Sequence, residues 1–402
     1  MFCENPGTHG FKSELPRVKT GKGHLLSKRV VIVSSNAWSI TNFRAGIIRG
    51  LIADGYEVTA IAVPDKHVPE FEQIGCSYIP LRMENTGTNP LKDLWLFMTY
   101  RRLFGKLRPD CVLAYTVKPN IYGSLAAQSL GIPVVNNIGG LGYAFVQSGW
   151  LMKLVMQLYR RAFRRSQRVF FQNKDDREFF LKSRLVRESQ AGLLPGSGVD
   201  TRRFSPDLTT KSTRPGVRFL LIARLLWDKG IGEYVEAARM LRARYPDCEF
   251  ALLGFLGVPN AMSVSADQMD KWVSAGWVSY LGHSGDVRPF IADADCVVLP
   301  SYREGTPRTL LEAASMAKPI ITTDAIGCRE VVQDGVNGYL VKVRSAKDLS
   351  EKMEKMLLLP REEREAMGLR GREWVTREFD EKIVVQRYLA EVEKAVSHGS
   401  AA

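Results

Sequence analysis

The stretch Val297–Val331, VVLPSYREGTPRTLLEAASMAKPIITTDAIGCREV, contains the features that decide the fold. The apolar run that ends at Leu299-Pro300 has the length of a buried strand. The pair Thr306-Pro307 then predicts a helix start, with threonine as the N-cap and proline at the first helical position. This order leaves Glu304 on a loop and places Glu312 inside the helix. A strand followed by a short loop and a helix is typical of an α/β sheet.

The two glutamates of this stretch suit a nucleotide sugar. In an open α/β sheet, ligands bind at the carboxyl ends of the strands, where a helix N-terminus offers N–H groups and positive potential to an anion. Arg308 adds a cation there. The N–H groups can hold a diphosphate while the carboxylates accept hydrogen bonds from sugar and ribose hydroxyls. An isolated pair of glutamates at this spacing more commonly lies on a surface loop and helix.

Together with the surrounding residues Leu299–Pro307, the motif Glu304-(seven residues)-Glu312 resembles the signature of the family 4 retaining glycosyltransferases. The resemblance covers about residues 29 to 397. It implies the GT-B fold, an α/β architecture in which two Rossmann-like domains with parallel sheets face each other across a cleft and a C-terminal helix crosses back to the N-terminal domain. It also implies that Glu304 orients the donor sugar and Glu312 the ribose. The other expected donor-binding residues are Gly305, Thr306, Pro307, Arg308, Thr309 and Gly254.

A second motif lies ahead of the first. The predicted strand Val217–Ile222 is followed by Arg224 and Lys229, at a strand end and the next helix entry, where two cations can act on one oxyanion. The spacing resembles the R-x4-K pair of the same family, which neutralises the nucleotide diphosphate. We therefore expect Glu304, Arg224 and Lys229 to be the catalytic residues. The turn that begins at Gly254 can face the nucleotide base.

Length and composition agree with a two-domain globular protein. The chain has 402 residues, of which 45% are hydrophobic. It has no apolar run of the ~20 residues that span a bilayer, and its start lacks an apolar signal core. We expect a cytoplasmic protein. The six cysteines are scattered and the five histidines do not cluster, so we expect no metal site, no cofactor and reduced, buried thiols.

The positive charge belongs to the N-terminal half. Residues 1–200 contain 27 Lys and Arg against 15 Asp and Glu, or +12, and the remainder contains 29 against 28, or +1. Such a field favours anionic lipid, phosphate-bearing substrates or nucleic acid. The segment Trp150–Arg168 combines a helical apolar stripe with six basic residues. It predicts either a helix on an anionic membrane surface or an ordinary domain helix with a basic side.

The order of strands and turns predicts the domain boundaries. Short β-branched runs alternate with helical stretches from Arg29 onward, which indicates parallel sheets with helical crossovers. Turn-forming residues gather near residue 196. We predict a flexible tail (1–27), an acceptor-binding domain (28–195), a linker (196–215), a nucleotide-sugar-binding domain (216–377), and a crossing helix with a tail (378–402).

Three loops after strands of the first domain are candidate acceptor sites. They contribute Asn36 and Trp38, then Lys118 and Asn120, then Gly140 and Tyr143. The first can equally be a capped strand-to-helix turn, and Lys118 can equally be a solvated lysine. Many family members carry a Gly-Gly pair in the first loop, and this chain does not. No histidine occurs between His67 and His283, which argues against a histidine-dependent step.

These observations predict a retaining hexosyltransferase. The expected donor is a UDP-sugar, and the expected acceptor is a polyprenyl-diphosphate-linked saccharide at the inner face of the plasma membrane, with no nucleic-acid partner. Shorter segments, such as Ile222–Arg224 and Ser301–Gly305, resemble bacterial enzymes of protein glycosylation, capsule and O-antigen assembly. A UDP-sugar epimerase, a glycogen-type phosphorylase and a non-enzymatic basic membrane or nucleic-acid binder are the rival hypotheses.

Overall fold

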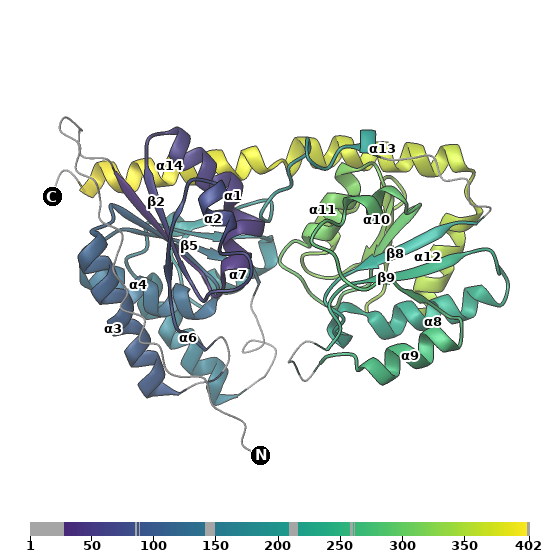
Figure 1. Cartoon of the computed structure of the whole chain (residues 1–402), viewed down its shortest axis with the longest axis horizontal. Helices are drawn as coiled ribbons and strands as arrows, with labels where there is room; N and C mark the ends of the chain where they lie inside the picture. The colour runs from purple at the N-terminus through teal and green to yellow at the C-terminus, as the bar shows by residue number, and fades with distance from the viewer. Residues whose placement is uncertain are drawn as a thin grey trace, which may run out of the picture.

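The computed structural model describes residues 28–84, 87, 89–140, 149–208, 216–257, 260 and 262–399 (Figure 1). The predicted N-terminal tail, part of the linker and the acceptor candidate Tyr143 lie outside these residues. The described chain forms two parallel sheets, one of seven strands and one of six. Figure 1 shows them side by side, each with its own helices, as the GT-B resemblance implies.

The N-terminal sheet has the strand order β3-β2-β1-β4-β5-β6-β7, with all neighbours parallel. Its central strands are buried on both faces, as expected where helices cover a parallel sheet. The strands are β1 (Arg29–Val33), β2 (Glu57–Ala62), β3 (Ser77–Pro80), β4 (Cys111–Tyr115), β5 (Val134–Ile138), β6 (Arg168–Phe171) and β7 (Ala191–Leu193). The main helices are α1 (Ala37–Ala53), α2 (Glu70–Gln73), α3 (Pro90–Leu107), α4 (Ser124–Ser129), α6 (Trp150–Phe163) and α7 (Lys174–Lys182), with a π-helical turn at Pro119–Gly123 before α4.

The C-terminal sheet has the order β10-β9-β8-β11-β12-β13 and is also parallel. Its strands are β8 (Arg218–Ile222), β9 (Glu249–Leu253), β10 (Ser279–Tyr280), β11 (Cys296–Leu299), β12 (Ile320–Thr323) and β13 (Gly338–Val341). Its helices are α8 (Ile231–Arg242), α9 (Ala266–Ser274), α10 (Arg288–Ala292), α11 (Arg308–Ser315), α12 (Ala346–Leu358) and α13 (Arg361–Glu378), and the chain ends in α14 (Glu381–Gly399).

Helix α14 returns to the N-terminal domain, which confirms the predicted crossing. Val384, Tyr388 and Val392 are buried in the same core cluster as residues of α1 and β4. A side chain at Gly50 of α1 would collide with Val385, so the glycine lets the two helices approach closely. In Figure 1, α14 (yellow) lies along the top of the N-terminal half, and α13 lies along the top of the C-terminal half.

The predicted helix Trp150–Arg168 is wrong at its end. Helix α6 stops at Phe163, and Arg168 is the first residue of strand β6. The guanidinium of Arg168 pairs with Glu391 of α14 at 3.0 Å, so this basic residue stabilises the crossing helix. Arg160, which lies in α6, donates to the backbone carbonyls of residues 183 and 184. Some of the basic residues of this segment therefore have structural partners.

The five described cysteines are buried and unpaired, as predicted. Burial raises the pKa of Cys76 and of Cys328 to about 12, so both thiols stay protonated at neutral pH.

Within the described ranges, no helix has the length and apolar character needed to cross a bilayer.

Candidate functional site

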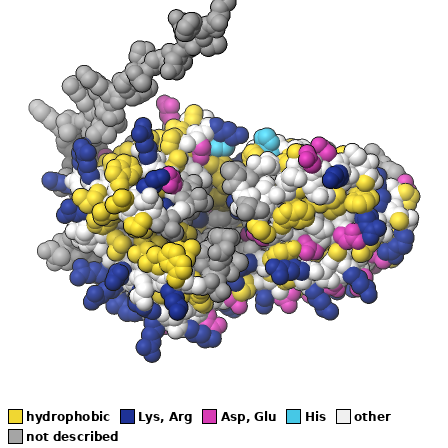
Figure 2. All heavy atoms as spheres, turned by 90° about the horizontal axis from the view of Figure 1, so that it is seen from below, with side chains coloured by type: hydrophobic (Ala, Val, Ile, Leu, Met, Phe, Trp, Pro, Cys, Tyr) yellow, Lys and Arg dark blue, Asp and Glu magenta, His cyan; other side chains and the backbone are white. Residues whose placement is uncertain are grey.

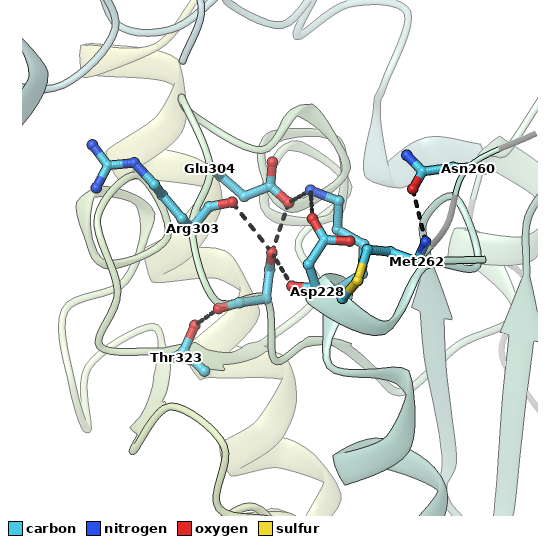
Figure 3. Close-up of polar contacts among 8 residues, drawn as sticks. Asp228, Asn260, Met262, Arg303, Glu304 and Thr323 are labelled. Carbon is cyan, nitrogen blue, oxygen red and sulfur yellow. Dashed lines mark hydrogen bonds and ion pairs between the residues drawn. The ribbon is translucent and has the colours of Figure 1, made fainter. Parts of the chain in front are cut away.

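The two sequence motifs meet at one ion pair. Strands β8 and β11 are parallel neighbours, so the loops at their carboxyl ends lie together. Lys229, from the loop after β8, donates from Nζ to Glu304 Oε1 at 2.6 Å, and Glu304 belongs to the loop after β11. Ser301 Oγ donates to the same oxygen at 2.9 Å. Figure 3 shows Glu304 in this group of polar contacts, beside Asp228.

The backbone holds these two loops together. The N–H of Tyr302 donates to the carbonyl of Asp228 at 2.9 Å. Gly230 has φ +74°, and a Cβ there would overlap the carbonyl oxygen of Pro300. Only glycine combines this left-handed conformation with so close an approach. The Lys229–Glu304 pair therefore lies on a fixed frame, which favours a preorganised role.

Arg224 is placed differently from Lys229. Its side chain is exposed and has no hydrogen bond or ion pair with the described residues, whereas Lys229 is buried. The expected action of Arg224 and Lys229 on one anion therefore stays a prediction, because no contact of the Arg224 side chain with the described residues bears on it. An exposed guanidinium at a strand end has all of its donors free for a ligand. The role of Arg224 in diphosphate binding stays a proposal.

The start of α11 corrects one prediction. Pro307, with ψ 114°, is the N-cap residue, and no side chain caps the helix. Thr306 does not cap it, because its hydroxyl donates to the carbonyl oxygen of Gln172 in the N-terminal domain at 3.0 Å. The first N–H groups of an α-helix have no partner inside the helix. The first turn, Arg308 and Thr309, thus keeps the N–H donors that an anion needs.

Glu312 is buried one turn further along α11. Arg308 Nε donates to Glu312 Oε1 at 2.9 Å, an ion pair between residues four apart on the helix. Burial raises the pKa of Glu312, and the Arg308 guanidinium partly offsets this shift. The guanidinium also donates to the carbonyl of Asn42 and lies over the ring of Phe43, both on α1. Glu312 is therefore fixed by a side chain that spans the two domains.

The loop that carries Glu304 touches the N-terminal domain directly. Asn173 Nδ2 donates to the carbonyl of Gly305 at 3.2 Å, and a Cβ at Gly305 would overlap the carbonyl of Gly139. Arg303 pairs with Asp176, whose side chain is fully buried. Desolvation raises the pKa of Asp176, and the Arg303 guanidinium opposes that shift. These contacts join the loop after β11 to the start of α7.

The remaining donor candidate, Gly254, has a backbone role. Its φ is +158°, and a Cβ would overlap the carbonyl of Ala223, where the loops after β8 and β9 meet. The next residue, Phe255, is 45% exposed and stacks on His283 with ring centroids 4.4 Å apart. This exposed aromatic pair at the carboxyl edge of the sheet offers a face to a base. The sequence did not reveal the pair, because the two residues lie 28 positions apart.

The acceptor candidates fall into two groups. Asn36 caps α1, accepting from the N–H of Ser39 at 2.8 Å, and Trp38 is 40% exposed beside it. Lys118 pairs with Asp93 at 2.8 Å and is neither solvated nor free. Asn120 is buried, and its side-chain amide donates from Nδ2 to the carbonyl of Asn137 and accepts at Oδ1 from Asn136. These contacts assign Lys118 and Asn120 internal partners, while the first loop stays accessible.

Gly140 lies where the two domains approach. It has φ +137°, and a Cβ at this position would come within 3.8 Å of the N–H of Gly305. Because 3.8 Å is an ordinary van der Waals distance, the positive φ, and not a lack of space, favours glycine at this position. Tyr143, a few residues on, lies outside the described residues.

Sequence reasoning missed the N-terminal side of this contact. Gln172, Asn173 and Asp176 read locally as a strand end, an N-cap and an acidic first helical turn, and Asn173 does cap α7. Their second function, contact with residues 303–306, depends on partners more than 120 positions away. Among the described residues, no group of three or more His, Cys, Asp or Glu could hold a metal ion.

Comparisons with known proteins place this geometry in context. The model described as "Glycosyl transferase 4-like domain" matches residues 40–196. The model described as "Glycosyl transferases group 1" matches residues 210–374. The two matches together cover most of the chain and both sheets.

Curated relatives match over long stretches. The chain is 28% identical over 386 residues to the N,N'-diacetylbacillosaminyl-diphospho-undecaprenol alpha-1,3-N-acetylgalactosaminyltransferase of Campylobacter jejuni, covering 92% of this chain and 100% of that protein. It is 25% identical over 283 residues to the UDP-Gal:alpha-D-GlcNAc-diphosphoundecaprenol alpha-1,3-galactosyltransferase of Escherichia coli, covering 68% of this chain and 72% of that protein.

Solved structures share the fold. A glycosyltransferase from Rickettsia africae superposes with a TM-score of 0.74 at 16% identity, covering 92% of this chain and 99% of that one. Anabaena Alr3699/HepE in complex with UDP and glucose also gives a TM-score of 0.74, at 17% identity, covering 91% of this chain and 99% of that one. At these identities the likeness establishes the two-domain architecture.

Proposed function

The chain belongs to the family 4 glycosyltransferases, retaining enzymes of the GT-B fold, and from this premise we propose that it moves a hexose or N-acetylhexosamine from a UDP-sugar to a polyprenyl-diphosphate-linked saccharide. The observation that carries the proposal is the contact of the two motifs at the Lys229–Glu304 pair. The printed names of both relatives include a diphosphate-linked undecaprenol saccharide, and one of them includes UDP-galactose. This shared chemistry supports the acceptor and donor classes.

The leaving group requires positive charge. In a retaining transfer, the bond between the sugar and the diphosphate breaks, and the acceptor hydroxyl attacks the same face of the sugar. Negative charge grows on the departing diphosphate, so we assign its stabilisation to Lys229, Arg224 and the first-turn N–H groups of Arg308 and Thr309. The donor phosphate takes the proton from the acceptor hydroxyl, which requires no separate carboxylate base.

The carboxylates orient the donor. An ionised carboxylate has about four acceptor positions, so Glu304 can bind sugar hydroxyls while it keeps its contacts to Lys229 and Ser301. Lys229, which is assigned to the diphosphate, thereby also holds the Glu304 carboxylate that is assigned to the sugar. Glu312, paired with Arg308, is assigned to the ribose hydroxyls.

One assay separates this function from its rivals. Release of UDP from a panel of UDP-sugars, with and without a lipid-linked saccharide, should depend on the acceptor and yield a lengthened saccharide. An epimerase would convert the sugar without releasing UDP. A non-enzymatic membrane binder would release none, and a phosphorylase would require phosphate and a glucan.

A further inference from the structure

Helix α3 has two apolar stripes, and only one of them faces the core. Leu96, Tyr100 and Phe104, spaced four residues apart, are buried under the helix. The opposite side follows the same helical spacing and faces outward. Its four large apolar side chains are all at least half exposed: Leu91 (78%), Leu94 (59%), Trp95 (52%) and Met98 (50%).

Helix α6 repeats this arrangement on a smaller scale. Val155, Tyr159 and Phe163 are buried against the domain. One helical turn apart on the outer side, Trp150 is 72% exposed and Leu154 is 43% exposed. The apolar stripe predicted for this segment is therefore divided, with one part in the core and one part at the surface.

The two helices belong to the same side of the N-terminal domain. Both pack on the π-helical turn that precedes α4. Because crossover helices run antiparallel to the strands, α3 and α6 both begin at the carboxyl edge of the sheet, where the exposed tryptophans lie. Figure 2 shows hydrophobic side chains gathered over the N-terminal domain in the view from below, with Lys and Arg side chains around them. We call the outward side chains of α3 and α6 the α3–α6 surface.

The charge around this surface is mainly positive, and its acid Glu84 is paired with Lys92 of α3. From residue 111 to residue 174 the sequence contains eight Lys and Arg and no Asp or Glu. Helix α3 has a single acid, Asp93, which Lys118 neutralises and which also accepts from Tyr122. Arg101 and Arg102 continue the outward stripe of α3, and both are exposed. Apolar side chains with a basic border and no free acid complement an anionic lipid leaflet.

We propose that the α3–α6 surface docks on an anionic membrane leaflet. Tryptophan is the side chain that favours the boundary between lipid headgroups and acyl chains, and the basic border attracts the leaflet before insertion. The inference rests on the proposed function, because a polyprenyl-linked acceptor lies in such a leaflet. Docking here would bring the carboxyl edge of the N-terminal sheet, with the loops of Asn36 and Gly140, to the lipid side.

The first test measures vesicle binding without any substrate. The full chain is sedimented with phosphatidylglycerol vesicles and with phosphatidylcholine vesicles. Trp95→Ser combined with Trp150→Ser should lower binding to phosphatidylglycerol by at least roughly tenfold, because two large apolar side chains no longer enter the bilayer. A matched control is Leu358→Ser with Leu369→Ser, which removes two side chains that are 64% and 53% exposed on the other domain. The control should bind as the unaltered protein does.

A second test separates charge from insertion. Arg101→Gln with Arg161→Gln should weaken binding to phosphatidylglycerol at low salt, and the difference should shrink as salt screens the leaflet. Lys271→Gln with Lys347→Gln removes two exposed charges from the C-terminal domain and is the matched control. Brominated phosphatidylglycerol should quench the tryptophan fluorescence of the unaltered protein more than that of a Trp95→Phe, Trp150→Phe variant.

Two results would overturn the inference. One is equal vesicle binding by the tryptophan variant and its leucine control. The other is self-association of the unaltered protein, seen by ultracentrifugation and lost in the tryptophan variant, without vesicle binding by either. Because neither assay uses a donor or an acceptor, both are independent of the proposed function. That function fails separately, if no UDP-sugar yields UDP with a detergent-solubilised acceptor.

Discussion

Glu304 and Glu312 belong to one motif but depend on different parts of the structure. Glu304 lies on a loop and is held by Lys229 and Ser301, so its position requires two loops of the C-terminal domain to pack together. Glu312 lies inside α11 and is held by Arg308 of the same helix. The side chain of Glu304 is 19% exposed and that of Glu312 is 12% exposed.

This difference shows how the two carboxylates can have separate functions. The loop of Glu304 contacts the N-terminal domain through Arg303 and Gly305, so the position of the carboxylate depends on how the two domains meet. Glu312 is fixed mainly within its own helix, by burial and by Arg308, although the Arg308 guanidinium also contacts Asn42 and Phe43 of α1. We therefore expect changes at Glu304 to affect the reaction and changes at Glu312 to affect donor affinity.

The largest expected effect is on turnover. Glu304→Ala should lower kcat by about 10² to 10³, the range found when one preorganised polar group is removed from a transition state. UDP affinity should stay nearly constant, because this carboxylate is assigned to the sugar. Steady-state kinetics and UDP titration by calorimetry measure the two quantities. Loss of UDP affinity with an unchanged kcat would contradict the assignment.

The next effect concerns the ribose. Glu312→Ala should weaken donor binding by about 1.5 to 3 kcal/mol, the usual range for a hydrogen bond to a charged group, which is roughly tenfold to a hundredfold in affinity. The cost should appear in KM and in UDP affinity more than in kcat. Arg308→Gln serves as a comparison, since it leaves the carboxylate in place and removes its partner. Equal UDP affinity of Glu312→Ala and the unaltered protein would disprove the ribose assignment.

A smaller effect tests the contact between the domains. Asp176→Asn removes the charge that holds Arg303, next to Glu304, and should lower kcat about tenfold through misplacement of the loop. The fold should tolerate the change, because the Arg303 side chain is 35% exposed and can be hydrated. Asp175→Asn, an exposed neighbour in the same helical turn, is the matched control. Additive effects of Asp176→Asn and Arg303→Gln would show that the two residues act independently.

Local patterns were sufficient for most of the fold. The predicted strand Val217–Ile222 agrees with β8 to within one residue, and the apolar run expected to end at Leu299-Pro300 is the buried strand β11. Strands β3 and β7 were not predicted. They have only four and three residues, and β7 contains no β-branched side chain, so neither has the pattern that distinguishes a strand from a loop.

The candidate site was only partly predictable, because some of its contacts join residues that lie far apart in the sequence. The residue types and spacing of the two motifs indicated a common site before the structure showed that Lys229 and Glu304 touch. Thr306 was expected to cap its own helix, but the carbonyl of Gln172 in the other domain accepts its hydroxyl instead. A contact between domains competes with a local hydrogen bond, and the sequence around Thr306 shows only the local alternative.

The smallest effect separates the two carboxylates by pH. Burial raises the pKa of Glu312, so this carboxyl takes up a proton at a higher pH than an ordinary glutamate. As the pH falls through that value, the neutral carboxyl accepts ribose hydroxyls less well, and UDP affinity should decrease. The sign for stability is opposite. A carboxyl whose pKa is raised by folding favours the folded state at low pH, and this contribution is lost as the pH rises through the folded-state value.

The unaltered protein should therefore lose UDP affinity on acidification. Over the same change of pH, the protonated Glu312 should destabilise the folded state less than the ionised Glu312 does at higher pH. Calorimetric titrations between about pH 5 and 7 measure the first effect, and melting temperatures over the same range measure the second. Glu312→Gln is the control, since it is neutral throughout and leaves the titration of UDP and of all other groups in place. If the affinity of this variant falls with pH as steeply as that of the unaltered protein, another group controls donor binding, and the buried carboxylate of α11 is not the ribose ligand.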